Sequence, residues 1–394
     1  MATRVGGFVV ASIHSRVVPA FVVLFALLAG EAQAGAIAPV TIVPPGNIQS
    51  IQGAGSNMAG YTSGQVITEA INGAITNFFG GGGGPPAGFA AVSPTQFSSA
   101  FAPELQFMTE AEEGFSALAY AGRTKVARTP SARAPMREPE WMVWGDVHYT
   151  GYERDSAGRD LRGEQVNVTG GVSRRITRDW LVGLVAGYEN IDSKSNAVAA
   201  GLRGVGGSIG GYSSYRFGAL RFDAALTWTG LSYDATAPGQ TGSFDANRLI
   251  GYVALTGNHY WGAFVVEPSL RFYMAWEWQD QWTDSGNTVR PSQDISVGRF
   301  SFGGRLIRPG AWWWHDVTVA PYLGLYGDAR FSKNGTVPIN ATLLGIEDGL
   351  SGRVTYGAEF RNSRGFRLAL GGEYGGIGAD YDIWTFLARG VWPL

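Results

Sequence analysis

One stretch of the sequence carries the spacing of a known catalytic motif. Residues 204–210 read GVGGSIG, so Gly206, Ser208 and Gly210 match the G-x-S-x-G pattern. A nucleophile elbow needs a strand, a sharp turn and a following helix, with a base elsewhere in the fold. Ser208 lies instead inside a predicted strand of glycine and serine. Chance and the packing of small residues explain the motif better, and we predict that the protein is not an enzyme.

The residue types that bind metals or phosphates give no pattern either. His148, His259 and His315 lack metal-like spacing. The chain has no cysteine, which excludes thiolate sites and disulfides. The glycine run 80–84 lacks the lysine of a phosphate-binding loop. We therefore predict no cofactor and no metal, and a net charge of −2 gives no indication of nucleic-acid binding.

The more informative side chains are charged and alternate with apolar ones. In residues 264–278, FVVEPSLRFYMAWEW, the even positions are all apolar, whereas Glu267, Arg271 and Glu277 stand at odd positions. Successive side chains of a strand point to opposite faces, so these charges share one face of a sheet. The same alternation gives the full set of candidate lumen-lining residues: Asp146, His148, Arg221, Asp223, Glu267, Arg271, Glu277, Asp328, Arg330, Arg353, Glu359, Arg361, Arg367 and Glu373.

The elements that position these charges are long alternating segments that begin at Glu140 and continue to the C-terminus. Segments of this kind, separated by turn residues, are typical of an outer-membrane β-barrel. The high content of glycine, 58 residues, and of aromatic residues, 13%, fits such a protein. We predict twelve strands, near residues 140–152, 165–176, 180–191, 203–216, 219–233, 247–258, 262–279, 295–308, 314–331, 350–362, 365–376 and 383–394.

The connections between these strands alternate in length, as expected when short turns lie on one side of a membrane and loops on the other. The predicted loops are 153–164, 192–202, 234–246, 280–294 and 332–349. A soluble β-sandwich is the alternative, with its polar face in water. The barrel is favoured because the strands reach the roughly 9–11 residues that cross a bilayer and because tryptophans gather near strand ends, as in interfacial girdles.

Ahead of the barrel, residues 1–34 have the plan of a secretory signal peptide, with an apolar run at 17–30 and a cleavage signal that ends at Ala34. Residues 65–79 form a predicted short helix with Ser63 as its cap, because Ile67, Ile71 and Ile75 are spaced four apart. A second predicted helix covers 103–122, and a basic, proline-rich linker follows it.

From residue 141 onward the chain resembles the translocator β-barrel of the autotransporter family, the type V secretion proteins of Gram-negative bacteria. The resemblance is carried by WMVWGDVHYTGYERD (141–155), LRGEQVNVTGGVSRRITRDWLVGLVAGYENID (161–192) and LRFDAALTWTGLSYD (220–234). It implies an all-β membrane protein, a 12-stranded antiparallel transmembrane barrel at 140–394, with a short, partly helical N-terminal segment. Residues 35–102 would be the passenger, and 103–139 the pore helix and linker.

The resemblance also implies function and partners. The barrel would sit in the outer membrane and display or export its passenger at the cell surface. Its partners would be outer-membrane lipid, periplasmic chaperones and the barrel-assembly machinery, with the protein itself a monomer. The family's barrels usually end in an aromatic residue that this machinery recognises. Here Phe386 and Trp392 keep the aromatic alternation, whereas Leu394 replaces the final aromatic residue.

Three questions stay open at this point. The inward charges either line a water-filled or plugged lumen, which we favour for most of them, or hold a helix or a passing chain. The barrel either displays its passenger or is a passive pore with a degenerate one. Some autotransporters cleave themselves after an asparagine inside the barrel. Residues 98–139 contain no asparagine, so we predict no cleavage there.

Overall fold

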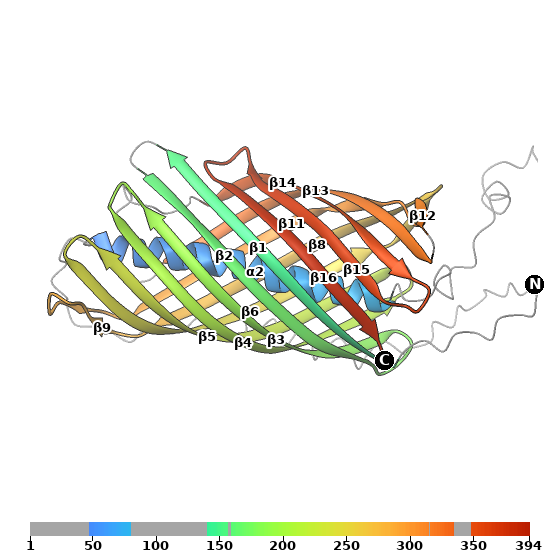
Figure 1. The fold of residues 1–394 in the computed structure, drawn as a ribbon, viewed down its shortest axis with the longest axis horizontal. Helices are drawn as coiled ribbons and strands as arrows, with labels where there is room; N and C mark the ends of the chain where they lie inside the picture. The colour runs from blue at the N-terminus through green and yellow to red at the C-terminus, as the bar shows by residue number, and fades with distance from the viewer. Residues whose placement is uncertain (1–46, 80–139, 157–158, 315, 335–347) are drawn as a thin grey trace, which may run out of the picture. The chain divides into compact units, whose positions relative to one another are not determined.

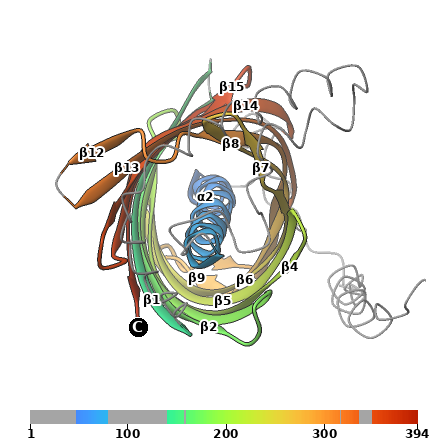
Figure 2. The same cartoon turned by 90° about the vertical axis from the view of Figure 1, so that its right-hand side faces the viewer.

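The computed structural model describes residues 47–79, 140–156, 159–314, 316–334 and 348–394. All of them belong to one compact unit, Pro45–Leu394. The unit consists of a β-barrel with one long helix inside it (Figures 1 and 2). The predicted signal peptide with its cleavage site at Ala34, the predicted helix at 103–122 and the basic linker lie outside the described residues.

Fourteen strands form one antiparallel sheet. Two of them, β7 and β12, have three residues each and pair with the first residues of β8 and β13, at the short turns. The other twelve are the predicted barrel strands. They are β1 (Trp141–Ser156), β2 (Arg159–Arg175), β3 (Trp180–Ser195), β4 (Ala200–Phe217), β5 (Leu220–Ala237), β6 (Gln240–Gly257), β8 (Phe264–Gln279), β11 (Gln293–Ile307), β13 (Val317–Asn334), β14 (Gly349–Asn362), β15 (Arg367–Ile377) and β16 (Asp382–Pro393). The short strands are β7 (His259–Trp261), β9 (Trp282–Thr283), β10 (Val289–Arg290) and β12 (Trp312–Trp314).

Sequential strands pair with each other, and the first strand pairs with the last. The β1–β16 register runs from Met142 opposite Pro393 to Glu153 opposite Asp382. This pairing closes the sheet, so no long edge is left with unpaired backbone groups. Closure is what a sheet needs in order to cross a bilayer, where no water is present to hydrogen-bond an open edge.

The two faces of the sheet have the predicted compositions. On β1, Val143, Val147 and Tyr149 are exposed on the outer face, whereas Asp146 and His148 are buried on the inner one. The outer face of β3 is apolar from Trp180 to Tyr188 and polar beyond it. On β3 the band of exposed apolar residues thus covers only part of the strand, as expected for a surface in lipid.

Three of the predicted loops are wrong. Residues 153–164, 192–202 and 234–246 are mostly strand, because β1 to β6 have 16–18 residues each. A bilayer crossing uses only about 9–11. Beyond the apolar band the outward side chains become polar, as at Asn190, Lys194 and Arg203, all of them exposed. The apolar half of the alternation disappears there, although the hydrogen-bonded ladder continues.

The described helix, α2, spans Asn47–Phe79. It therefore begins well before the predicted helix at 65–79, and Ser63 lies inside it rather than at its cap. At about 1.5 Å per residue its 33 residues extend for about 50 Å. Figure 2 shows the helix surrounded by the barrel strands. These residues lie within the predicted passenger segment, 35–102, and the structure places them in the lumen, where the sequence predicted residues 103–122.

Candidate functional site

The candidate functional site is the contact surface between α2 and the inner wall of the barrel. The helix contains five glycines and a single charged residue, Glu69. Glycine costs up to about 1 kcal/mol per position in a helix, so this sequence is a poor helix former by itself. Nearly every side chain of α2 from Ile48 to Phe78 is buried. Enclosure by the wall therefore stabilises the helix.

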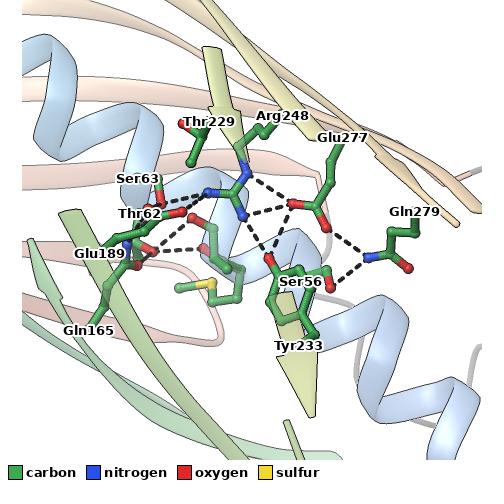
Figure 3. Close-up of polar contacts among 12 residues, drawn as sticks. Ser56, Thr62, Ser63, Gln165, Glu189, Thr229, Tyr233, Arg248, Glu277 and Gln279 are labelled. Atoms are coloured by element: carbon green, nitrogen blue, oxygen red, sulfur yellow. Dashed lines mark hydrogen bonds and ion pairs between the residues drawn. The ribbon is translucent and has the colours of Figure 1, made fainter. Parts of the chain in front are cut away.

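Arg248 on β6 is the centre of the polar network in Figure 3 and is fully buried. Its Nε and Nη2 donate hydrogen bonds to Glu277 at 2.9 and 2.7 Å, and Nη1 donates to Glu189 at 2.7 Å. Nη1 also donates to the hydroxyl of Ser63 on α2 at 2.8 Å. One guanidinium group thus joins two wall carboxylates and the helix.

The network continues along the helix on both sides of Ser63. Gln165 on β2 donates to the Ser63 hydroxyl at 2.8 Å, and Ser63 donates in turn to Glu189. Towards the helix N-terminus, Gln279 on β8 donates to Ser56 at 2.8 Å and accepts from Gln52 at 2.7 Å. These contacts give hydrogen-bond partners to polar groups that burial separates from water.

A second network surrounds Glu69. Nη1 of Arg353 on β14 donates to Glu69 at 2.9 Å and to Glu373 at 3.0 Å, and its Nε donates to Asp328 at 2.7 Å. Arg271 on β8 lies 3.9 Å from Glu69. Glu69 is therefore held by guanidinium groups from two strands that are not neighbours in the sheet.

At its C-terminal end the helix contacts arginines near the short turns. Arg221 on β5 donates to Asn72 at 2.6 Å and to Thr76 at 3.0 Å. Arg175 and Arg216 lie over the rings of Phe78 and Phe79, at 4.8 and 5.1 Å from the ring centroids. The last turn of α2 has no basic residue of its own. The wall thus supplies the cations that a helix C-terminus favours.

Apolar packing and glycines complete the contact. Ile51, Met58 and Ile71 of α2 belong to one buried cluster with wall residues such as Leu202 and Tyr233. A Cβ atom on Gly64 would lie 2.4 Å from the ring of Tyr273. One on Gly73 would lie 1.2 Å from the guanidinium of Arg389. These glycines allow wall side chains to lie against the helix backbone.

The structure places the predicted lumen-lining residues on the inner face of their strands. Arg221, Arg271, Arg330, Arg353 and Arg367 contact α2 directly. The others pair within the wall: Asp146 with His148 and Arg389, Asp223 with Arg221, Glu267 and Glu359 with Arg305, Glu277 with Arg248, and Asp328 and Glu373 with Arg353. Arg361 lies directly opposite Arg367 in the β14–β15 register.

Sequence reasoning missed several wall residues that take part in these networks. Arg299 and Arg305 stand at alternating positions of β11, so their signal was present in the pattern. Arg248 was missed because it lay at the edge of a predicted strand that is in fact longer. Glu189 was missed because the neighbouring inward residues of β3, Val185 and Ile191, are apolar.

The three residues of the candidate assembly signal lie on the last strand or directly after it. Phe386 and Trp392 are exposed on the outer face of β16, and Leu394 is exposed at the end of the chain. The backbone N–H of Leu394 donates to the carbonyl of Trp141 at 3.0 Å, which extends the β1–β16 ladder past Pro393. Their recognition by the assembly machinery stays a prediction.

Among the described residues, no group of histidine and acidic side chains could hold a metal ion. The same part of the chain contains no helix long and apolar enough to cross a membrane. What the arrangement provides is a hydrogen-bonded seat for one polypeptide helix, with charge on the wall and almost none on the helix.

The fold resembles solved translocator domains at low sequence identity. The β domain of the Bordetella autotransporter BrkA is 17% identical, with a TM-score of 0.51, and the match covers 65% of this chain and 100% of that one. The translocator domain of NalP from Neisseria meningitidis is 11% identical, with a TM-score of 0.53, and the match covers 73% of this chain and 96% of that one. None of the curated proteins compared with the chain matches it in sequence.

A family model described as the autotransporter β-domain matches residues 143–374, which is more than half of the chain. The match begins in β1 and ends in β15, so it includes nearly the whole closed sheet. The chain therefore belongs to the autotransporter family, and its barrel is an outer-membrane translocator domain of that family.

Proposed function

We propose that this translocator domain displays the residues that precede α2 at the cell surface and that α2 holds them there as a fixed plug. The observation that supports this most directly is the direction of the helix. Residues near its N-terminus, Gln52 and Ser56, contact Gln279 at the end of β8 that leads into the longer connection. Residues near its C-terminus contact Arg175 and Arg216, beside the short turns.

In outer-membrane barrels the short turns face the periplasm and the longer loops face outward. The C-terminus of α2 and the start of β1 both lie at the short-turn end of the barrel. Trp141, the first residue of β1, pairs with Arg174, and the next residue, Arg175, lies over the ring of Phe78. The C-terminus of α2 at Phe79 thus belongs to the periplasmic end of the barrel, and its N-terminus at Asn47 to the outward end. The displayed passenger would be shorter than the predicted 35–102, because α2 occupies the lumen.

The passive-pore alternative is disfavoured by the filled lumen. Polar and apolar wall residues both pack on α2, and side chains such as Arg248, Tyr233 and Leu202 are fully buried against it. We expect low conductance for the intact protein in a planar bilayer and a large increase when 47–79 is deleted. High conductance of the intact protein would favour the open pore.

Labelling of single cysteines on intact cells tests the display. The chain has no native cysteine, so each substitution gives one labelled site. Ala379→Cys and Ser363→Cys are matched controls, since both residues are exposed and they lie at opposite ends of β15. We expect Thr41→Cys and Ala379→Cys to react with a membrane-impermeant maleimide on intact cells. Ser131→Cys and Ser363→Cys should react only after the outer membrane is opened. A Thr41→Cys variant that stays unlabelled while Ala379→Cys reacts would refute the display of this segment.

A further inference from the structure

Apart from Gly64 and Gly73, on which Tyr273 and Arg389 pack, the surface of α2 offers few features that would stop it from sliding along the lumen. Its residues are mainly small or uncharged, with glycine, alanine and serine frequent in its N-terminal half. Between Glu31 and Glu104 the sequence contains one charged residue, Glu69. A chain that moves outward through the barrel, as the proposed function requires, therefore brings a single charge into the lumen with this stretch.

On the inner wall of the barrel, the carboxylate of Glu69 lies in one cluster of charged side chains. Three guanidinium groups, of Arg271, Arg299 and Arg353, lie around two wall carboxylates, of Asp328 and Glu373. Arg353 contacts both carboxylates, and Arg299 lies 3.7 Å from Asp328. Formally the wall groups carry three positive and two negative charges. Glu69 adds the third negative charge, so the cluster is balanced only when α2 is at its observed depth.

The neutral contacts of α2 do not specify depth in the same way. Asn57 and Asn72 accept hydrogen bonds from Arg330 and Arg221. Serine, threonine, asparagine and glutamine are spread along the whole helix, so a displaced helix would bring other acceptors to these arginines. No second carboxylate exists to replace Glu69. One helical turn away, the corresponding positions are Gln65 and Gly73.

We infer that Glu69 sets the register of α2, as the single residue whose arrival opposite Arg353 and Arg271 stops the outward movement of the chain. Glu69 is a positioning residue in this proposal. It determines how many residues stay outside, and it does so by completing the charge balance of the buried cluster. The inference rests on the proposed function, since it concerns a chain that passes through this barrel.

The register can be read from a disulfide between helix and wall. A Cβ atom on Gly60 would lie 3.9 Å from the Cβ of Ala275 on β8, within the range of about 3.5–4.5 Å found in disulfides. Gly60→Cys with Ala275→Cys should therefore cross-link in the native register. Ser56 lies one helical turn before Gly60, on the outward side. A disulfide between Ser56→Cys and Ala275→Cys therefore reports a helix that has moved towards the periplasm by about one turn.

Glu69→Gln keeps the size of the side chain and removes its charge. In this background we expect the yield of the Gly60→Cys/Ala275→Cys disulfide to fall about tenfold or more, because breaking a buried charge pair is strongly unfavourable. The matched control is Thr68→Val, which keeps the size of a side chain next to Glu69 and removes a hydroxyl that donates to the carbonyl of Gln65 within α2. It should leave the yield unchanged. A wild-type yield in the Glu69→Gln background, or an equal loss in the Thr68→Val background, overturns the inference.

Moving the carboxylate gives a second, independent test in which the charge balance is restored. In the Gln65→Glu/Glu69→Gln background we expect the cross-link to transfer from the Gly60→Cys pair to the Ser56→Cys pair. If the Gly60→Cys pair still cross-links as in wild type, shape alone sets the register and Glu69 has no such role. Surface labelling of Thr41→Cys is a separate readout. Loss of that labelling with the cross-links behaving as expected would refute the display and leave the register role of Glu69 standing.

Discussion

Replacement of Arg248 by methionine is the most direct test of how the wall and helix depend on each other. Methionine fills a similar volume without the charge, and it leaves Glu189 and Glu277 buried with no guanidinium beside them. Removing one partner of a buried ion pair costs about 3–5 kcal/mol, because the other charge stays uncompensated. Two carboxylates lose their partner here, which raises the cost within this range.

Remaining hydrogen bonds act in the opposite direction. Glu189 still accepts from Ser63 and Gln165, and Glu277 still accepts from Gln279 at 2.7 Å. We therefore expect Arg248→Met to lower the free energy of unfolding by about 3–5 kcal/mol, which changes the unfolding equilibrium constant by about two to four powers of ten. The free energy of unfolding is measured by urea titration of the protein in lipid vesicles, with the fluorescence of its 13 tryptophans as the signal.

The control for Arg248→Met is a triple variant that also carries Glu189→Gln and Glu277→Gln. It removes all three charges, and replacing a whole buried ion network by neutral groups is often close to neutral in stability. We expect it to recover most of the lost free energy. A loss below about 1 kcal/mol in the single variant, or a triple variant less stable than the single one, would refute the view that charge balance holds this part of the lumen together.

Three further changes test other parts of the structure. Gly64→Val should lower the free energy of unfolding by about 1–3 kcal/mol, because the added methyl groups overpack against Tyr273. Gly207→Ala is the control and should leave it unchanged, since no atom lies within 4 Å of the new Cβ. The urea titration measures both variants. Leu184→Arg, at an outward position that is 65% exposed, should cost about 2–4 kcal/mol if lipid covers it. Asn190→Arg, at an exposed position on the polar extension of the same strand, should change the free energy of unfolding by less than about 1 kcal/mol. In the connection between β8 and β11, the backbone N–H of Thr288 donates to Asp284 and, with Arg290, holds the pKa of its carboxyl below the usual value. A lowered pKa means that ionised Asp284 stabilises the folded loop at pH values above the ordinary aspartate pKa, and that this stabilisation is lost as the pH falls through the lowered value. Proteolysis of residues 282–290 should therefore increase in acid. Asp284→Asn should remove this dependence on pH.

The sequence predicted the barrel because each strand meets two different surroundings. Lipid requires an apolar outer face over a limited height, and the alternation at Val143, Asp146 and Val147 records this directly. Beyond the lipid the outer face meets water, and the alternation disappears although the strand continues, as at Asn190 and Lys194. The prediction of loops failed at these positions because hydrophobic periodicity reports the surroundings of a strand rather than its hydrogen bonds.

The helix was harder to predict for a related reason. A surface helix shows an apolar stripe because only one side of it is buried. The wall surrounds α2 on all sides, so apolar residues, glycines and hydroxyls are distributed around it without a stripe. Only the segment with Ile67, Ile71 and Ile75 has the spacing that predicts a helix. The partners of the lumen arginines could not be identified from sequence, because they lie on a segment that is separated from the barrel by about 60 residues.

The helix and the barrel each lack what the other supplies. The helix has no basic residue in its last turn, and Arg175 and Arg216 of the wall lie there. The wall has more guanidinium than carboxylate groups around Arg353, and Glu69 of the helix balances them. Apolar wall residues such as Leu202 and Tyr233 would line an aqueous channel if α2 were absent, and Ile51 and Met58 cover that part of the lumen. Because helix and wall complete each other in the observed register, the native arrangement is a single core shared by both. The free energy of folding of the barrel therefore includes the binding of α2 in the lumen.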